Sequence, residues 1–185
     1  KFTRFMSEGS TGISSNTEFF EISNIGDKTA YLEGWTFSVT TSGGTDPFVF
    51  GDLTIPAMSA VIFAADPNGL GVYEDGIIVG FASGFNEAPT LPNDGAALQI
   101  TDPAGALADT IVYGNGPVEV NGWSGISLVE PVSGINLIIY HRGDGCGALD
   151  DTDTVSDWHH RWGRLGGSTF CDDQTFSGES EVIPL

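Results

Sequence analysis

The stretch "LPNDGAALQITDPAGALADTIVYGNG", residues 91–116, decides the fold class of this chain. Apolar residues alternate with small or polar ones over Ala96–Ile100 and Gly105–Tyr113, which is the period-two pattern of strands buried on one face. Between them, "TDPAG" supplies Asp102 to bond the following backbone, a proline with fixed φ and a glycine that tolerates positive φ. The two segments therefore predict a β-hairpin, and "PNDG" predicts the turn that precedes it.

The same alternation recurs along most of the chain, with Gly, Asn, Asp or Pro at the breaks. No stretch shows sustained helical periodicity, and a spacing of roughly 8 to 12 residues between breaks is typical of an antiparallel β-sandwich. The C-terminal "EVIPL" predicts an edge strand, because Pro184 has no N–H to donate. The other predicted strands are Phe2–Ser7, Thr17–Asn24, Gly34–Thr40, Pro47–Phe50, Ala60–Ala65, Gly76–Phe81, Gly125–Pro131 and Asn136–Arg142.

Length and composition indicate one domain over residues 1–185. With 185 residues and 40% hydrophobic content, the chain can bury one sizeable core but not two. The 26 glycines and 9 prolines lie in turns without a repeat, which favours many short strands over disorder. No window of eighteen apolar residues occurs, so we expect no membrane span.

The charge balance is strongly acidic. Lys and Arg total 6 against 25 Asp and Glu, which gives a formal net charge of -19. Such a surface repels phosphate backbones, so we expect no nucleic-acid partner. Either the charge serves solubility in salty or extracellular water, or it serves a function that depends on cations.

Two cysteines and the first residues suggest an extracellular protein. The chain begins "KFTRF" without Met, which is typical of a processed, secreted product. In a secreted protein the even pair Cys146 and Cys171 favours one disulfide that closes a Gly- and Asp-rich loop. The alternative is a zinc site that adds His159 and His160, although neighbouring residues of a strand point to opposite faces.

Five segments follow, in order, the motifs of one domain family. With them the chain resembles the lamin-tail domain, an immunoglobulin-like module of nuclear lamins and of secreted prokaryotic proteins. The match covers about residues 3–115 and consists of "EFFEISN" (Glu18–Asn24), "LEGWTFS" (Leu32–Ser38), "TIPAMSAVIFA" (Thr54–Ala64), "LPNDGAALQI" (Leu91–Ile100) and "DPAGALADTIVY" (Asp102–Tyr113).

The resemblance implies an immunoglobulin-like antiparallel β-sandwich, and only loosely a function. Residues 116–185 would extend the same domain with the Cys-closed loop, and the segment after Tyr140 would be an irregular C-terminal excursion. The family usually has Gly in place of Met58 and Asp in place of Ala96, so we expect those turns to differ in detail.

The residues of the matching segments are of kinds that build a fold. Trp35 would be the large filler between the two sheets. The turn formers are Asn24, Asn93, Gly34 and Gly95, and the predicted core residues are Phe20, Ile22, Trp35, Leu98, Ile111 and Tyr113.

We expect no enzyme. No G-x-S-x-G, H-E-x-x-H or phosphate-cradling loop occurs. Glu18 and Glu21 lie three apart on a predicted strand, hence on opposite faces, and cannot work as a paired acid and base.

An Asp-rich run, "GDGCGALDDTDTVSD", predicts calcium as the one candidate cofactor, because carboxylates in a flexible loop are hard oxygen ligands. The run does not fit the twelve-residue EF-hand pattern, and a solvated acidic loop is the alternative. The candidate ligands are Asp150, Asp151, Asp153 and Asp157.

A sandwich with open edge strands can recruit an extended terminal segment from a neighbouring copy. We therefore expect a secreted structural protein that forms a homopolymer, filamentous or at the cell surface, by β-strand addition. The candidate exchanged residues are Phe2 and Phe5 in "KFTRFM" and Val182 and Ile183 in "SEVIPL".

The alternative function is a monomeric adhesion module. It would bind cell-surface glycans or another ligand through the loop around Trp123 or Trp158.

Overall fold

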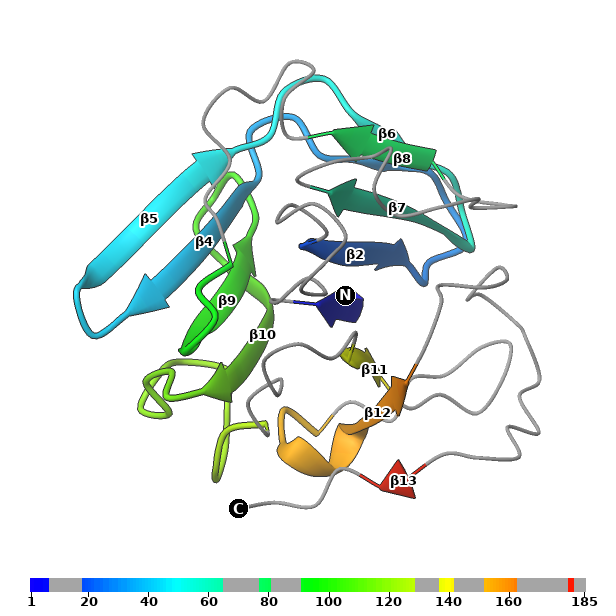
Figure 1. Ribbon diagram of the computed structural model, residues 1–185. Coiled ribbons are helices and arrows are strands. Elements are labelled where there is room, and N and C mark those ends of the chain that lie inside the picture. Colours follow the sequence, from blue (N-terminus) through cyan, green and yellow to red (C-terminus); the bar gives the residue numbers. More distant parts are fainter. Residues whose placement is uncertain are drawn as a thin grey trace.

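The computed structural model describes residues 1–6, 18–64, 77–80, 91–128, 137–141, 152–162 and 180–181. Over these residues the chain forms two facing β-sheets, shown side-on in Figure 1, and a short two-stranded sheet. The all-β sandwich predicted from the sequence is confirmed, whereas the immunoglobulin-like connectivity stays a prediction. No helix in the described part of the chain is both long and apolar enough to cross a bilayer.

The larger sheet has the strand order β13-β12-β11-β1-β2-β7-β8. Its neighbours pair antiparallel except β7 and β8, which are parallel and so depart from the purely antiparallel expectation. The strands are β1 (Phe2–Met6), β2 (Phe19–Asn24), β7 (Ser59–Ala64), β8 (Ile77–Gly80), β11 (Leu137–His141), β12 (Trp158–Trp162) and β13 (Ser180–Glu181).

The smaller sheet has the order β10-β9-β4-β5 and is antiparallel throughout. A 3₁₀ turn, η1 (Val155–Asp157), leads directly into β12. The remaining strands are β4 (Thr36–Thr41), β5 (Gly44–Val49), β9 (Gly95–Thr101), β10 (Leu107–Gly114) and the short pair β3 (Ala30–Tyr31) and β6 (Thr54–Ile55).

The predicted hairpin at residues 91–116 is confirmed as β9 and β10. In its turn, Asp102 Oδ1 accepts hydrogen bonds from the backbone N–H groups of Ala104 (2.9 Å) and Ala106 (2.8 Å). Gly95 has a φ of 122°, and a Cβ there would lie 2.3 Å from the backbone nitrogen of Asn115. The fixed sequence pattern thus reflects turn chemistry and close backbone packing.

Two other turns are fixed in different ways, one by a side chain and one by its backbone conformation. Asn24 joins the end of β2 to the short sheet, because its Nδ2 donates to the carbonyls of Ile55 and Pro56, both at 3.0 Å. Met58 has a φ of 51°, a left-handed conformation that favours glycine. This turn therefore keeps a glycine-like backbone despite its methionine.

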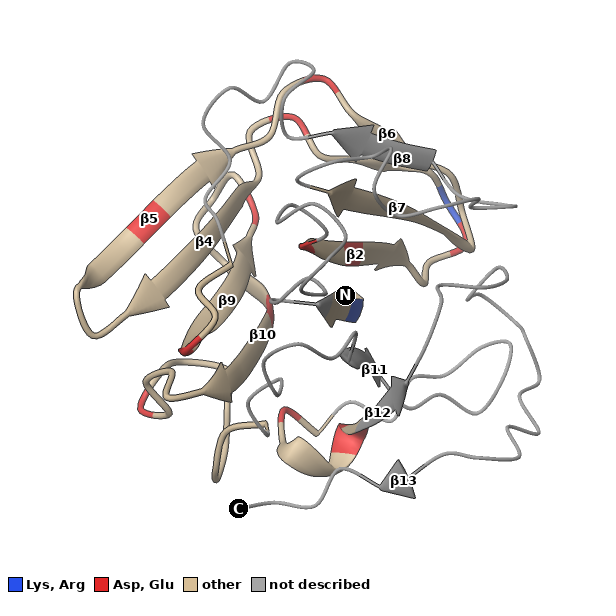
Figure 2. Ribbon diagram, in the orientation of Figure 1, with Lys and Arg blue, Asp and Glu red and all other residues tan. Residues whose placement is uncertain are grey.

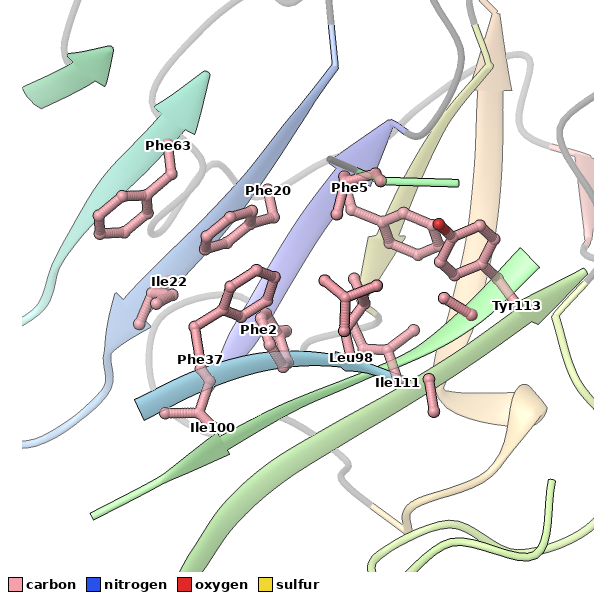
Figure 3. Packing of buried hydrophobic residues seen from close by; sticks show 14 of the residues in the cluster. Phe2, Phe5, Phe20, Ile22, Phe37, Phe63, Leu98, Ile100, Ile111 and Tyr113 are labelled. Carbon is pink, nitrogen blue, oxygen red and sulfur yellow. The ribbon is translucent and has the colours of Figure 1, made fainter. Parts of the chain in front are cut away.

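Aromatic rings fill the space between the two main sheets. Phe37 of β4 stacks on Phe20 of β2 with ring centroids 4.1 Å apart, and Phe2 of β1 meets both rings edge-on at 6.1 Å. Figure 3 shows these three rings meeting between the sheets. The core therefore draws on the first strand as much as on the predicted motifs.

Most of the predicted core residues are buried, and one differs. Trp35 is only partly buried and packs against the margin of the core, since it lies just before β4. Phe37, two residues later, takes the position between the sheets that the sequence assigned to Trp35. The buried predicted residues are Phe20, Ile22, Leu98, Ile111 and Tyr113.

Two further expectations need correction. In the predicted strand Gly125–Pro131, residues 125–128 are not an extended strand, and Leu128 makes only an isolated bridge to Tyr113. The segment after Tyr140 was expected to be an irregular excursion, but β12 adds a strand to the larger sheet by pairing with β11. The alternation of Trp158, His160 and Trp162 is the period-two signal that the prediction missed.

Replacement of Phe37 by Ala should lower the free energy of unfolding by about 3 to 5 kcal/mol, because it leaves a cavity among buried rings. Trp35→Ala is the matched control and should cost clearly less, since the indole lies at the margin of the core. Urea unfolding of both variants measures the difference. Equal losses would mean that the two side chains are equally buried.

Candidate assembly interface

The first strand lies in the middle of the larger sheet, not at its edge. β1 pairs antiparallel with β2 on one side, where Phe5 is opposite Phe20, and with β11 on the other, where Phe5 is opposite Ile139. Figure 1 shows β1 between these two strands. We call the position that β1 fills between β2 and β11, facing Asp109 of β10, the β1 slot.

One face of β1 supplies core side chains. Phe2 and Phe5 are both 0% exposed. The Phe5 ring lies 5.0 Å from that of Tyr113 on β10 and 6.0 Å from that of Trp158 on β12, measured between centroids. The predicted exchange residues therefore fill the sandwich core in the way a donated strand would.

The other face of β1 carries a buried polar cluster. Arg4 lies opposite Glu21 of β2, and both are 1% exposed. Glu21 Oε1 accepts hydrogen bonds from Arg4 Nε (3.0 Å) and Thr3 Oγ1 (2.6 Å), while Arg4 Nη2 donates to Glu21 Oε2. The Thr3 hydroxyl also lies 2.7 Å from the Ser23 hydroxyl. The register of β1 on β2 is thus fixed by an ion pair and its hydrogen bonds.

Asp109 of β10 ties the start of β1 to the smaller sheet. Its Oδ2 accepts a hydrogen bond from the Phe2 N–H (2.5 Å), and its Oδ1 accepts one from the Thr110 N–H (2.9 Å). The Lys1 ammonium lies 3.8 Å from Oδ1. Asp109 is 5% exposed, so these donors offset the cost of burying its charge.

Sequence reasoning missed Asp109, although a signal was present. It shares its strand phase with Ile111 and Tyr113, both fully buried, so the alternation places a carboxylate on the core face. A polar residue in an apolar phase requires a partner. The partners are Lys1 and Phe2, which lie more than 100 residues earlier in the chain, so no local sequence pattern reveals them.

The edges of the smaller sheet are poorly suited to strand addition. Edge strand β5 contains Pro47, which has no N–H and so interrupts the donors of any added ladder. The free side of β10 is partly occupied, because Leu128 N donates to Val112 O (2.8 Å) and Gly114 N to Leu128 O (2.9 Å). Compared with these two edges, the β1 slot is the better candidate for exchange.

At the C-terminal candidate, β13 pairs with β12 through two positions, His159 with Glu181 and His160 with Ser180. Val182 and Ile183 lie outside the described residues.

The predicted disulfide and zinc sites are not tested by the structure. Cys146 and Cys171 lie outside the described residues, as do Asp150 and Asp151 of the calcium prediction. His159 and His160 are described only as backbone of β12. Within the described ranges, no three His, Cys, Asp or Glu side chains gather in a way that could hold a metal ion.

Asp157 has a structural role that the calcium prediction did not foresee. It is 3% exposed and accepts hydrogen bonds from the backbone N–H groups of Thr152 (2.8 Å) and Thr154 (3.0 Å). The Thr152 hydroxyl donates to its other oxygen at 2.7 Å. The contact with the Thr154 N–H is one half of the capping box of η1, and all three hydrogen bonds hold the carboxylate within its own loop.

The two tryptophans of the glycan alternative are buried. Trp123 is 7% exposed and its indole N–H donates to Ile126 O (3.1 Å), while Trp158 is 2% exposed. Neither ring face is available to stack on a sugar. The two rings therefore cannot serve as stacking surfaces, and binding of a glycan or another ligand through the loops around them stays a prediction.

Glu18 precedes β2, and its surroundings change the pKa of its carboxyl group. Burial raises the pKa of Glu18, and a hydrogen bond from the Leu91 N–H (3.2 Å) opposes the rise. Since the folded protein favours the protonated form, ionisation of Glu18 costs stability at neutral pH, and this cost disappears on acidification.

Glu18→Gln should therefore unfold at a slightly higher urea concentration than the native chain at pH 7. The advantage should shrink as the pH falls through the raised pKa and vanish below the ordinary glutamate pKa of about 4.3. Urea unfolding across this pH range measures the effect. An advantage that persists in acid would contradict the assignment to Glu18 ionisation.

Asp109→Ala should destabilise the protein by about 1 to 3 kcal/mol, because it leaves buried N–H donors without their acceptor. Amide hydrogen exchange in β1 should quicken more than in β4. Asp102→Ala is the matched control, since it also removes an acceptor of two backbone N–H groups, but in an exposed turn. If both variants leave β1 equally protected, Asp109 does not hold the first strand.

A comparison of the chain with protein-family models gives no match. A comparison with curated proteins gives none either. The lamin-tail resemblance of the sequence therefore remains a prediction about this fold.

Proposed function

We propose that this chain is a secreted, non-enzymatic structural subunit of lamin-tail type that forms a homopolymer by exchanging its first strand. The observation that carries the proposal is the position of β1. This strand, joined to β2 by residues 7–18, fills the centre of a sheet and supplies two fully buried rings.

A strand in this position can be supplied by the same chain or by another copy. The contacts that hold β1 are backbone ladders to β2 and β11 and side-chain contacts to Asp109 and Glu21. A neighbouring copy would offer the same contacts, which is the condition for strand exchange. Loss of β1 would open the core, so an empty slot favours capture of a strand.

The connection is long enough for exchange. Met6 is opposite Phe19, so residues 7–18 join β1 to β2. Fully extended, this length of chain spans about 40 Å, which is about the width of a small domain. The operation gives an open polymer wherever its symmetry does not close.

Disulfide trapping tests the exchange. The hydroxyls of Thr3 and Ser23 are 2.7 Å apart, so cysteines at these positions lie within reach of each other. Oxidation of Thr3→Cys/Ser23→Cys after assembly should give a ladder of covalent multimers on a non-reducing gel, because the two cysteines that meet belong to different copies.

Thr40→Cys/Thr45→Cys is the matched control. It also replaces two touching hydroxyls on paired strands, 3.0 Å apart, but within the β4–β5 hairpin. It should give monomers only. Single-cysteine variants account for Cys146 and Cys171. If Thr3→Cys/Ser23→Cys also gives only cross-linked monomers, the first strand is not exchanged, and the monomeric binding module becomes the better explanation.

A further inference from the structure

We propose that the β1 slot selects its strand by charge, accepting a segment with cations at its first and fourth residues and aromatic rings at its second and fifth. This inference rests on the proposed function, and it identifies the partner as the first strand of a second copy of this chain.

The first strand has an unusual charge for this protein. The chain carries 6 Lys and Arg against 25 Asp and Glu, yet residues 1–6 include Lys1 and Arg4 and no acidic residue. Figure 2 shows blue on β1, whereas red segments are scattered over several other described parts of the chain. A cationic strand is therefore the complement of the acidic body that receives it.

Each cation meets a buried carboxylate, and the two carboxylates come from different sheets. Arg4 pairs with Glu21 of β2, and Lys1 lies beside Asp109 of β10. Glu21 and Asp109 are 1% and 5% exposed. Removing the cationic partner of a buried carboxylate is strongly destabilising, so a strand without these cations is disfavoured.

The register makes the selection specific to sequence. The pairing of β1 with β2 is irregular between Phe2 and Arg4. This irregularity allows the two cations to lie three residues apart in the sequence, and the two aromatic rings likewise. A slip by one residue would turn Arg4 toward the core and the rings away from it. The β1 slot therefore selects a strand by its charges and its aromatic residues together.

The same criteria exclude the C-terminal segment "SEVIPL" as the exchanged strand. It has no Lys or Arg, and it contains Glu181. Pro184 also has no N–H for a strand that must bond on both sides. Of the two candidate termini, the inference selects the first.

A directional cross-link tests both the exchange and the selection. One copy carries Thr3→Cys and the other carries Ser23→Cys, so a disulfide between them forms only when the strand of the first enters the slot of the second. With native charges, the mixed pair should cross-link. Adding Arg4→Glu to the strand copy should reduce the yield by more than about tenfold, and adding Glu21→Arg to the slot copy as well should restore it.

The outcomes separate the two proposals. No cross-link with native charges would overturn strand exchange itself. A cross-link that forms equally well with native charges and with Arg4→Glu would leave exchange intact and overturn selection by charge. Failure of Glu21→Arg to restore the yield, when circular dichroism shows both copies folded, would also overturn it.

A peptide competition gives the same information without altered folding of the protein. An excess of synthetic "KFTRFM" should suppress the cross-link between the native-charge copies as they assemble. The same peptide with Glu in place of Arg4 should not. Equal suppression by both peptides would contradict charge selection.

Discussion

The insertion of β1 between β2 and β11 is the constraint on which the rest of the structure depends. It joins the halves of the larger sheet, places Phe2 against the rings of Phe20 and Phe37, and meets Asp109 from the facing sheet. Without it, two strands would lose a ladder partner and the core would open on one side. The stability of the fold and the assembly proposed above would therefore rest on the same few contacts.

The features that were predicted correctly from the sequence depend on contacts between residues close together in the chain. The β9–β10 hairpin follows from Asp102 and the glycines around it, since each acts within a few residues. Trp35 shows the limit of such reasoning. Alternation predicts which residues share a face of a strand, but not at which residue the facing sheet begins to cover that strand. Phe37 belongs to the same phase and lies deeper between the sheets.

The candidate site was predictable only in part. The sequence analysis predicted Phe2 and Phe5 as exchange residues, but in a segment added at an open sheet edge rather than in one that fills the sheet centre. The Arg4–Glu21 pair and the contact between Phe2 and Asp109 join residues far apart in the chain. Such pairings depend on topology, and period-two patterns carry no information about which strands become neighbours.

The pairing of β1 with β11 also means that β1 can complete its pairing only late in the synthesis of the chain. β1 is Phe2–Met6 and β11 is Leu137–His141, so one side of β1 has no partner until the later strand has been synthesised. At 5 to 20 residues per second, that interval lasts roughly ten seconds. Through this period the nascent chain presents a cationic, aromatic strand to its surroundings. Protein synthesis therefore has to keep that segment from pairing early with another chain.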